Sequence, residues 1–181
     1  DELLQWLGTT ADLPGAQGDL RRVLPQGPPG APLFILADMP EPADLEAGDL
    51  LSGPAGILLE GMLRAIGFTR EENFVSALAL TRIPGGQIRA DDVEALVQIN
   101  RKLIELVAPQ RVLILGDKTS RALIGMDIQE ARGWLREVNH GRGKTEAVVT
   151  FHPRFLLQRP QFKRAAWDDL KRLKKGMDVR A

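Results

Sequence analysis

The sequence predicts an α/β fold of three layers, helix, sheet and helix, around a central sheet of four parallel strands. Three observations predict this class. Four short runs of aliphatic and aromatic residues are separated by segments with the three-and-four spacing of amphipathic helices. The runs are apolar almost throughout, as in strands buried on both faces. Their alternation with helices favours right-handed crossovers and a ligand crevice at the carboxyl ends of the strands.

The first half of the chain contains two of the predicted strands. A helix is expected over residues 2–7, before a Pro- and Gly-rich linker at residues 25–30. The first strand covers residues 32–38 and the second covers residues 73–78. Between them, residues 56–66 carry leucine, methionine and isoleucine on one helical face, so a helix is predicted there.

The second half of the chain continues the alternation. A helix over residues 90–107 precedes a strand over residues 111–116, and a short helix over residues 118–124 follows it. The fourth strand covers residues 146–151, and a last helix runs over residues 161–175. The positions that this helix is expected to bury are Phe162, Ala166, Leu170 and Leu173.

Length and composition are those of one globular domain. Of 181 residues, 44% are hydrophobic and 27% are charged, which argues against disordered or fibrous chains. We expect residues 31–176 to form the domain, after an N-terminal helix and linker in residues 1–30 and before a tail in residues 177–181. Because no apolar run approaches the roughly 20 residues that span a bilayer, we expect a cytoplasmic protein without membrane contact. We also expect a monomer.

Charge is distributed unevenly along a chain with no net charge. The 24 basic and 24 acidic residues cancel, but residues 154–181 contain nine basic and three acidic residues. A local basic surface of this kind favours contact with nucleic-acid phosphates, although a solvated basic helix would show the same pattern. Residues 38–60, in contrast, contain six acids and no base.

Asp38 and His152 are the candidate catalytic residues. Asp38 closes the first strand, so its carboxylate should face the crevice, where it could position water or stabilise a cationic transition state; an Asx-type cap is the structural alternative. His152 follows the fourth strand and precedes Pro153, which stiffens the turn. A neutral imidazole there could donate to a developing anion or simply bond loop carbonyls. The other histidine, His140, is expected in an exposed hairpin or loop.

Other motifs are weaker or absent. Gly53 and Gly56 stand just before a predicted helix, where backbone amides could face an anion. The chain has no cysteine, which rules out disulfides, thiolate zinc sites and cysteine-held iron–sulfur clusters. It also has no P-loop and no dinucleotide fingerprint. The sequence therefore predicts neither a metal nor a cofactor.

These segments resemble the uracil-DNA glycosylase superfamily, above all its thermostable, iron–sulfur type known as family 4. Ala37-Asp38-Met39-Pro40-Glu41 falls where that family has Gly-Glu-Ala-Pro-Gly. Without a gap, Gly53 and Gly56 then match its Gly-x-Pro-Phe-Val-Gly-Arg-Ala-Gly segment. Thr150-Phe151-His152-Pro153-Arg154 and the residues after it track the family's ending. The resemblance covers residues 32–174 and implies a uracil-DNA glycosylase-like fold.

The resemblance implies base excision from a flipped nucleotide, with single-stranded or mispaired DNA as the easiest substrate. Asp38 would position water and stabilise the sugar cation, and His152 would hydrogen-bond the departing base. Arg154 would enter the minor groove, with Phe155 or Leu156 as a wedge in the vacated stack. The basic surface would contact phosphates. Its candidate residues are Lys163 and Lys171, and the implied base pocket consists of Met39, Pro40, Leu51, Ser76 and Ala77.

Three departures from the family pattern affect this reading. Leu51 replaces the phenylalanine that stacks on uracil, a contact worth roughly 1–3 kcal/mol. Ala77, beside Ser76, replaces the asparagine that reads the uracil edge, and a methyl group cannot supply that pattern of donor and acceptor. Cluster cysteines align with Thr81 and Leu96, so hydrophobic packing is expected to fill that space.

The sequence therefore predicts a DNA glycosylase, a hydrolase of base-excision repair, that acts on a deaminated base with altered or weakened recognition of uracil. Two alternatives stay open. A non-catalytic DNA-binding homologue would explain the loss of the family's residues at Leu51 and Ala77. A small-molecule hydrolase on the same scaffold would explain the acidic segment at residues 38–60.

Overall fold

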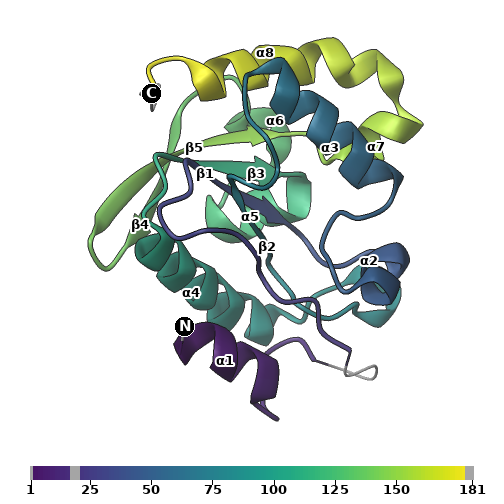
Figure 1. The fold of residues 1–181 in the computed structure, drawn as a ribbon, viewed down its shortest axis with the longest axis vertical. Helices are drawn as coiled ribbons and strands as arrows, with labels where there is room; N and C mark the ends of the chain where they lie inside the picture. Colours follow the sequence, from purple (N-terminus) through teal and green to yellow (C-terminus); the bar gives the residue numbers. More distant parts are fainter. Residues whose placement is uncertain (1, 17–20, 178–181) are drawn as a thin grey trace.

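The computed structural model describes residues 2–16 and 21–177, and its centre is a five-stranded sheet (Figure 1). The strand order is β2-β1-β3-β5-β4, with β4 antiparallel to β5 and all other pairs parallel. The sheet carries helices on both faces, which confirms the predicted three-layer α/β class. The strands are β1 (Leu33–Ala37), β2 (Phe74–Ala77), β3 (Arg111–Leu115), β4 (Arg136–His140) and β5 (Gly143–Thr150).

The prediction of a four-stranded sheet was incomplete, because it lacked the edge strand β4. Only Val138 of this strand is buried, so its sequence lacks the apolar run by which the other four strands were recognised. β4 and β5 form a hairpin in which His140 pairs with Gly143. His140 therefore lies in a hairpin, as expected, but it is half-buried and not exposed, and its Nε2 is 3.0 Å from Thr145 Oγ1.

The two faces of the sheet support separate apolar layers. Phe34 and Leu36 of β1 pack into the layer formed with α4 (Ala90–Val107), whereas Leu33 and Ile35 pack into the layer formed with α3 (Pro54–Ala65) and α8 (Lys163–Lys174). Alternate side chains of one strand therefore reach opposite layers, as the pleat requires. The layer on the α4 side also includes α1 (Glu2–Thr9) and α5 (Asp117–Leu123).

The long helices and the shorter α1 and α5 agree with the prediction, whereas the other short elements were not predicted. The helix over residues 90–107 is confirmed at both ends, because an apolar face over 18 residues is a strong periodic signal. The short elements are α2 (Pro42–Ala47), α6 (Ile128–Ala131), α7 (Pro153–Gln158) and the 3-10 turns η1 (Pro84–Gly86) and η2 (Pro160–Phe162). The prediction that the last helix buries Phe162 was wrong. Phe162 ends η2, just before α8, and is 37% exposed.

The N-terminal segment packs on the domain along its whole described length. Leu7 of α1 is fully buried, and the Val23 amide donates to the Leu80 carbonyl at 2.9 Å. Gln26, in the expected linker, exchanges two backbone hydrogen bonds with Val75 of β2. The division of the chain at residue 30 remains a prediction, and residues 178–181 of the expected tail lie outside the described residues.

Among residues 2–16 and 21–177, no helix combines the length and apolar composition needed to cross a membrane.

Candidate active site

A cavity of about 770 Å³ opens at the carboxyl ends of β1, β3 and β5. The chain proceeds from β1 to β2 on one side and returns to β3 on the other, so this is the switch point at which α/β sheets bind ligands. Asp38, Gly116 and His152 follow the three strands and line the cavity. A second hollow, of about 530 Å³ beside α2 and η1, contains neither candidate catalytic residue. The cavity at the switch point is therefore the candidate active site.

Asp38 places a buried carboxylate at the floor of this cavity. Its Oδ2 accepts a hydrogen bond from Arg154 Nη2 at 3.0 Å, whereas Oδ1 has no hydrogen-bond partner among the described residues. Burial by itself would raise the pKa of Asp38, but the charges of Arg154 and His152 and the hydrogen bonds to the carboxylate outweigh burial. The resulting pKa lies below its usual value, so Asp38 is ionised at neutral pH.

His152 faces Asp38 as a neutral imidazole. The residue caps α7, where its Nδ1 accepts a hydrogen bond from the Arg154 amide at 3.0 Å and Pro153 takes the first helical position. Burial and then the Arg154 charge lower the pKa of His152 to about 4. With Nδ1 accepting, the proton of the neutral ring is on Nε2. Nε2 lies 3.8 Å from Asp38 Oδ1 and has no hydrogen-bond partner among the described residues.

Gly116 allows the loop after β3 to lie close to His152. Its φ is 92°, in the region that favours glycine. A Cβ at this position would lie 3.3 Å from the Cβ of His152. A larger residue would therefore push the loop after β3 away from the imidazole.

Arg154 joins two acids at the mouth of the cavity. Besides Asp38, its guanidinium bonds Glu41 Oε1, and Arg82 Nη1 lies 3.6 Å from Glu41 Oε2. The Arg154 side chain is 38% exposed. One oxygen of Asp38 is thus held by a cation at the surface, while the other faces inward toward His152.

Three phenylalanines form one wall of the cavity. Phe155 lies 5.3 Å from Phe151, and Phe162 lies 5.2 Å from both, measured between ring centroids. The Arg132 guanidinium lies over the Phe151 ring, 4.3 Å from its centroid. Asp169 accepts a hydrogen bond from Arg132 at 2.7 Å, which fixes the guanidinium against the ring.

The family model of the uracil DNA glycosylase superfamily matches residues 24–171, most of the chain and the whole of the cavity lining. The chain belongs to the uracil-DNA glycosylase superfamily. It is similar to the type-4 uracil-DNA glycosylase of Pyrobaculum aerophilum, with 24% identity over 145 residues, 76% of this chain and 74% of that protein. It is also similar to the type-4 uracil-DNA glycosylase of Archaeoglobus fulgidus, with 25% identity over 133 residues, 70% and 67% of the two chains.

This member of the superfamily has no donor set for the iron–sulfur cluster that the family 4 resemblance implies. Of the positions that align with cluster cysteines, Thr81 donates a hydrogen bond from Oγ1 to the Gly15 carbonyl at 3.1 Å, and Leu96 is 1% exposed. The Leu96 Cδ1 would lie 3.4 Å from a Cβ at Gly15. A hydroxyl and a packed leucine cannot replace thiolates, so these residues do not fit a cluster.

In this superfamily member, three residues of the expected base pocket belong to the two apolar layers. Leu51 and Ala77 are 3% and 1% exposed and pack on the α3 side of the sheet. Ser76 points to the other side, where its Oγ is 3.0 Å from Oδ1 of the buried Asn100. None of the three lines the cavity. Their contact with a base stays a prediction.

Met39 and Pro40 are also buried and also lie outside the cavity lining, although they follow Asp38 directly. The Pro40 carbonyl accepts a hydrogen bond from Arg82 at 3.1 Å. The structure therefore brings Asp38 and His152 together, as the sequence predicts, but it does not gather the five expected pocket residues around them.

Of the two glycines at the start of α3, Gly53 is the N-cap and Gly56 packs closely in the first turn. A Cβ at Gly56 would lie 1.5 Å from the Leu51 carbonyl oxygen, so only glycine allows this approach. The Gly56 amide donates to the Gly53 carbonyl at 2.9 Å. This hydrogen bond uses the proton of the Gly56 amide, and the expected contact of the two glycines with an anion stays a prediction.

The expected wedge residues lie at different depths in α7. Phe155 is half-buried in the cavity wall. Leu156 is 1% exposed and packs with Phe151 and Ala166 in an apolar cluster, and its role as a wedge stays a prediction. The leucine that α7 exposes is Leu157, at 45%.

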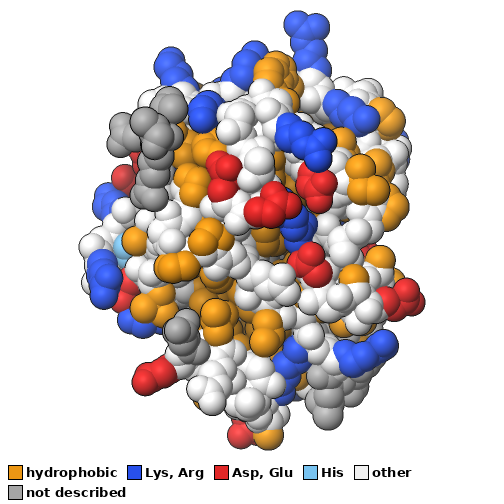
Figure 2. All heavy atoms as spheres, viewed as in Figure 1, with side chains coloured by type: hydrophobic (Ala, Val, Ile, Leu, Met, Phe, Trp, Pro, Cys, Tyr) orange, Lys and Arg blue, Asp and Glu red, His pale blue; other side chains and the backbone are white. Residues whose placement is uncertain are grey.

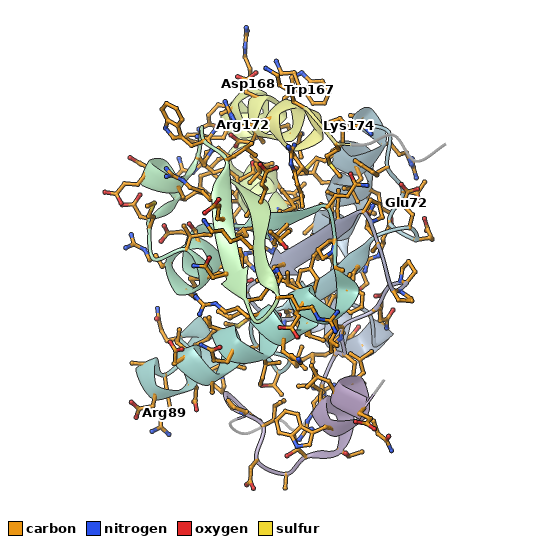
Figure 3. The ribbon with its side chains drawn as sticks, turned by 90° about the vertical axis from the view of Figure 1, so that its left-hand side faces the viewer. Glu72, Arg89, Trp167, Asp168, Arg172 and Lys174 are labelled. Atoms are coloured by element: carbon orange, nitrogen blue, oxygen red, sulfur yellow. The ribbon has the colours of Figure 1, made fainter. Side chains whose placement is uncertain are left out.

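The expected phosphate-binding residues lie at the surface of α8. Lys163 and Lys171 are exposed on α8, where Lys171 pairs with Asp168 at 2.8 Å. Figure 2 shows Lys and Arg side chains gathered along the edge formed by α8, and Figure 3 labels Arg172 and Lys174 on this helix. The basic surface is therefore real, although part of its charge is paired.

Sequence reasoning missed the residues that complete the cavity. Glu41 pairs with Arg154, and Gln129, Gln158 and Phe162 line the walls. A sequence signal existed for Glu41, which lies three residues after Asp38 in the same acidic segment. The sequence signal for the phenylalanine wall was weak. Phe155 and Phe162 belong to two helical segments with a break between them, so no single helical spacing relates them.

Proposed function

We propose that this protein is a DNA glycosylase that hydrolyses the N-glycosidic bond of a flipped, deaminated base, with recognition of uracil altered from the family pattern. One observation carries the proposal: Asp38 Oδ1 and His152 Nε2 face each other at 3.8 Å in the switch-point cavity, both buried and without a hydrogen-bond partner among the described residues. Membership of the superfamily supports the reaction class.

In the proposed reaction, the ionised Asp38 stabilises the positive charge that develops on the sugar and orients the attacking water. The bond between C1′ and the base nitrogen breaks, its electron pair leaves with the base, and the water oxygen bonds C1′. His152 donates a hydrogen bond from Nε2–H to the oxygen of the departing anionic base. Solvent takes the proton released from water and protonates the base. The lowered pKa values of both residues suit these roles at neutral pH.

Altered recognition of uracil is supported by the burial of Leu51 and Ala77 in the layer beneath α3. Neither offers an aromatic face or an amide to a base. The substrate is proposed to be single-stranded DNA or DNA with a flipped base, because flipping costs least there. We propose that the protein acts as a monomer in the cytoplasm, with residues 31–176 as its glycosylase domain.

A second candidate is a DNA-binding homologue without catalysis. The observation that favours it is the pairing of Arg154 with both Asp38 and Glu41, which holds a cation against the acid that the reaction needs. In this case, the cavity and the basic surface on α8 would hold DNA without cleaving it.

Cleavage separates the two candidates. Purified protein is incubated with single-stranded oligonucleotides that carry uracil, hypoxanthine or xanthine, and alkali then cuts the strand at abasic sites. The glycosylase produces cut strands from at least one base, and Asp38→Asn and His152→Ala each lower that rate by about 100-fold or more. Intact strands with all three bases would refute the glycosylase, and unchanged rates in both variants would refute the assigned roles.

A further inference from the structure

The cavity beside Asp38 has an aromatic wall made by residues that do not align with the family's base pocket. Phe155 comes from α7 and Phe162 from the end of η2, and their rings meet at 5.2 Å and an angle of 50°. Arg132 covers a face of Phe151. Phe155 is half-buried and Phe162 is 37% exposed, so these two rings provide the aromatic surface that a ligand could reach.

Polar groups border this wall. The side-chain amides of Gln129 and Gln158, both on the cavity lining, can each donate and accept hydrogen bonds. At the floor, Asp38 and His152 are each 4% exposed, and Asp38 Oδ1 and His152 Nε2 are buried without a hydrogen-bond partner among residues 2–16 and 21–177. Buried polar atoms without partners cost free energy that a bound ligand can recover. A flat ring with a polar edge, attached to a polar sugar, matches this arrangement.

The cavity has room for a two-ring base, and the aromatic wall favours one. About 770 Å³ lies within the range of roughly 300–1,000 Å³ that small-molecule sites occupy, and a purine covers more of an aromatic wall than a pyrimidine does. The family's stacking position offers no such wall, because Leu51 is buried and lies outside the cavity.

We propose that this cavity is a purine-binding subsite, in which a base of a DNA strand packs against the tilted rings of Phe155 and Phe162, stacked on one of them, and turns its edge toward Gln129 and Gln158. Placement of the attached sugar at Asp38 and His152 rests on the proposed glycosylase function. The stacking itself does not, since a homologue without catalysis would use the same wall.

Binding to a fluorescent purine tests the subsite. A short single-stranded oligonucleotide carries 2-aminopurine, thymine or an abasic analogue at one position, and the strand is verified intact after each measurement. Stacking is expected to quench 2-aminopurine. The purine strand should bind about tenfold more tightly than the abasic strand and more tightly than the thymine strand. Equal affinity for the purine and abasic strands, or for the purine and thymine strands, would overturn the proposal.

Variants assign this preference to the wall. Phe162→Leu keeps an apolar side chain but loses the ring, and it should reduce affinity for the purine strand to nearly that for the abasic strand, whereas Phe162→Trp keeps the preference. Gln158→Ala, at an exposed position, should weaken binding of the purine strand alone. Trp167→Leu is the matched control, because Trp167 is 39% exposed on α8 and outside the cavity lining. Thermal unfolding checks that each variant is folded. If Phe162→Leu leaves the preference for the purine strand unchanged, the assignment of that preference to the aromatic wall is contradicted.

The outcomes separate this subsite from the proposed function. Purine-dependent binding that Phe162→Leu removes, together with intact strands in the cleavage assay, supports the subsite and refutes the glycosylase. Cleavage that depends on Asp38 but binding that does not depend on Phe162 supports the glycosylase and refutes the subsite.

Discussion

The residues around the cavity floor are held in charge states that depend on one another. Arg154 stabilises the charge of Asp38 and opposes that of His152, and burial acts on both. The acid is therefore ionised and the imidazole neutral over the same range of pH. This coupling can be probed in two ways, by changing the pH and by replacing the arginine.

Neutral burial of His152 should make folding sensitive to pH. Its pKa of about 4 in the folded protein lies below the ordinary value of 6.5, so between these values the unfolded chain binds a proton that the folded protein does not. The free energy of unfolding should fall as pH drops from 6.5 to 4, by on the order of 3 kcal/mol for this group. The contribution of Asp38 is lost at lower pH, because its pKa is lowered from 3.8.

Urea unfolding of His152→Gln across this window measures the contribution of the imidazole. The variant cannot titrate there, so its stability should decline less with acid than that of the unmodified protein. His140→Gln, in the β4–β5 hairpin, is the matched control. If His152→Gln and the unmodified protein decline in parallel, the buried neutral imidazole is not the cause.

Replacement of Arg154 should leave the buried carboxylate of Asp38 without its cationic partner. Arg154→Met keeps the length of the side chain but removes the partner of Asp38 and Glu41, so the pKa of Asp38 should rise and the free energy of unfolding should fall by about 1–3 kcal/mol at pH 7. Below pH 4 the difference should shrink as Asp38 is protonated. Denaturant unfolding at both pH values checks this, with the exposed Arg159→Met as control. A decrease that is the same at both pH values would indicate weakened packing instead.

Among the elements, α3 depends on one close approach at its first turn. Gly56 lies against the Leu51 carbonyl, and Leu51 itself has a φ of 54°. This turn sets the path of the chain from the Asp38 loop into the helix. A side chain at Gly56 would have to displace backbone, which cannot give way as a flexible side chain can.

A pair of glycine substitutions on the same helix tests this. Gly56→Ala puts a Cβ 1.5 Å from the Leu51 oxygen and should cost more than about 3 kcal/mol of stability or prevent folding. Gly61→Ala meets no atom within 4 Å and should stabilise the helix by up to about 1 kcal/mol. Thermal unfolding of the two variants gives opposite shifts; equal shifts would contradict the close approach.

Over the whole molecule, basic charge is concentrated at the end formed by α8. The carboxyl edge of the sheet carries the acids of the Asp38 loop. The C-terminal turn of α8 lies at the opposite edge, where Arg111, the first residue of β3, donates hydrogen bonds to the carbonyls of Leu173 and Lys175. Figure 3 shows Arg172 and Lys174 at one end of the molecule and Arg89 at the other. The charges are thus far enough apart for their effects on DNA binding to be distinguished.

Neutralising the basic surface of α8 should lower the affinity for single-stranded DNA and make that affinity less dependent on salt concentration. Substitution of Lys171, Arg172, Lys174 and Lys175 by glutamine should reduce the slope of log K against log salt by about 0.7 for each phosphate that the protein no longer neutralises. Fluorescence anisotropy with a labelled single strand at several salt concentrations measures it. Arg89→Gln is the control at the opposite end. An unchanged slope in the fourfold variant would exclude α8 from the DNA-binding surface.

The sequence by itself determined the parallel strands, the long helices and the position of Asp38 and His152 at one edge of the sheet. These follow from periodicity and from strand order, which are local or topological properties. The absence of a cysteine-held cluster was also determined there, because no cysteine is present.

Only the tertiary structure decided which side chains surround the two catalytic candidates. Gly56 meets Leu51 through a fold-back of the chain, Leu156 and Phe155 of one short helix differ in burial, and Phe162 reaches Phe151 across a break between two turns. Such contacts depend on where separate elements pack and on which face of each is left open. No spacing in the sequence encodes them, so the proposed base-binding wall emerges only from the folded protein.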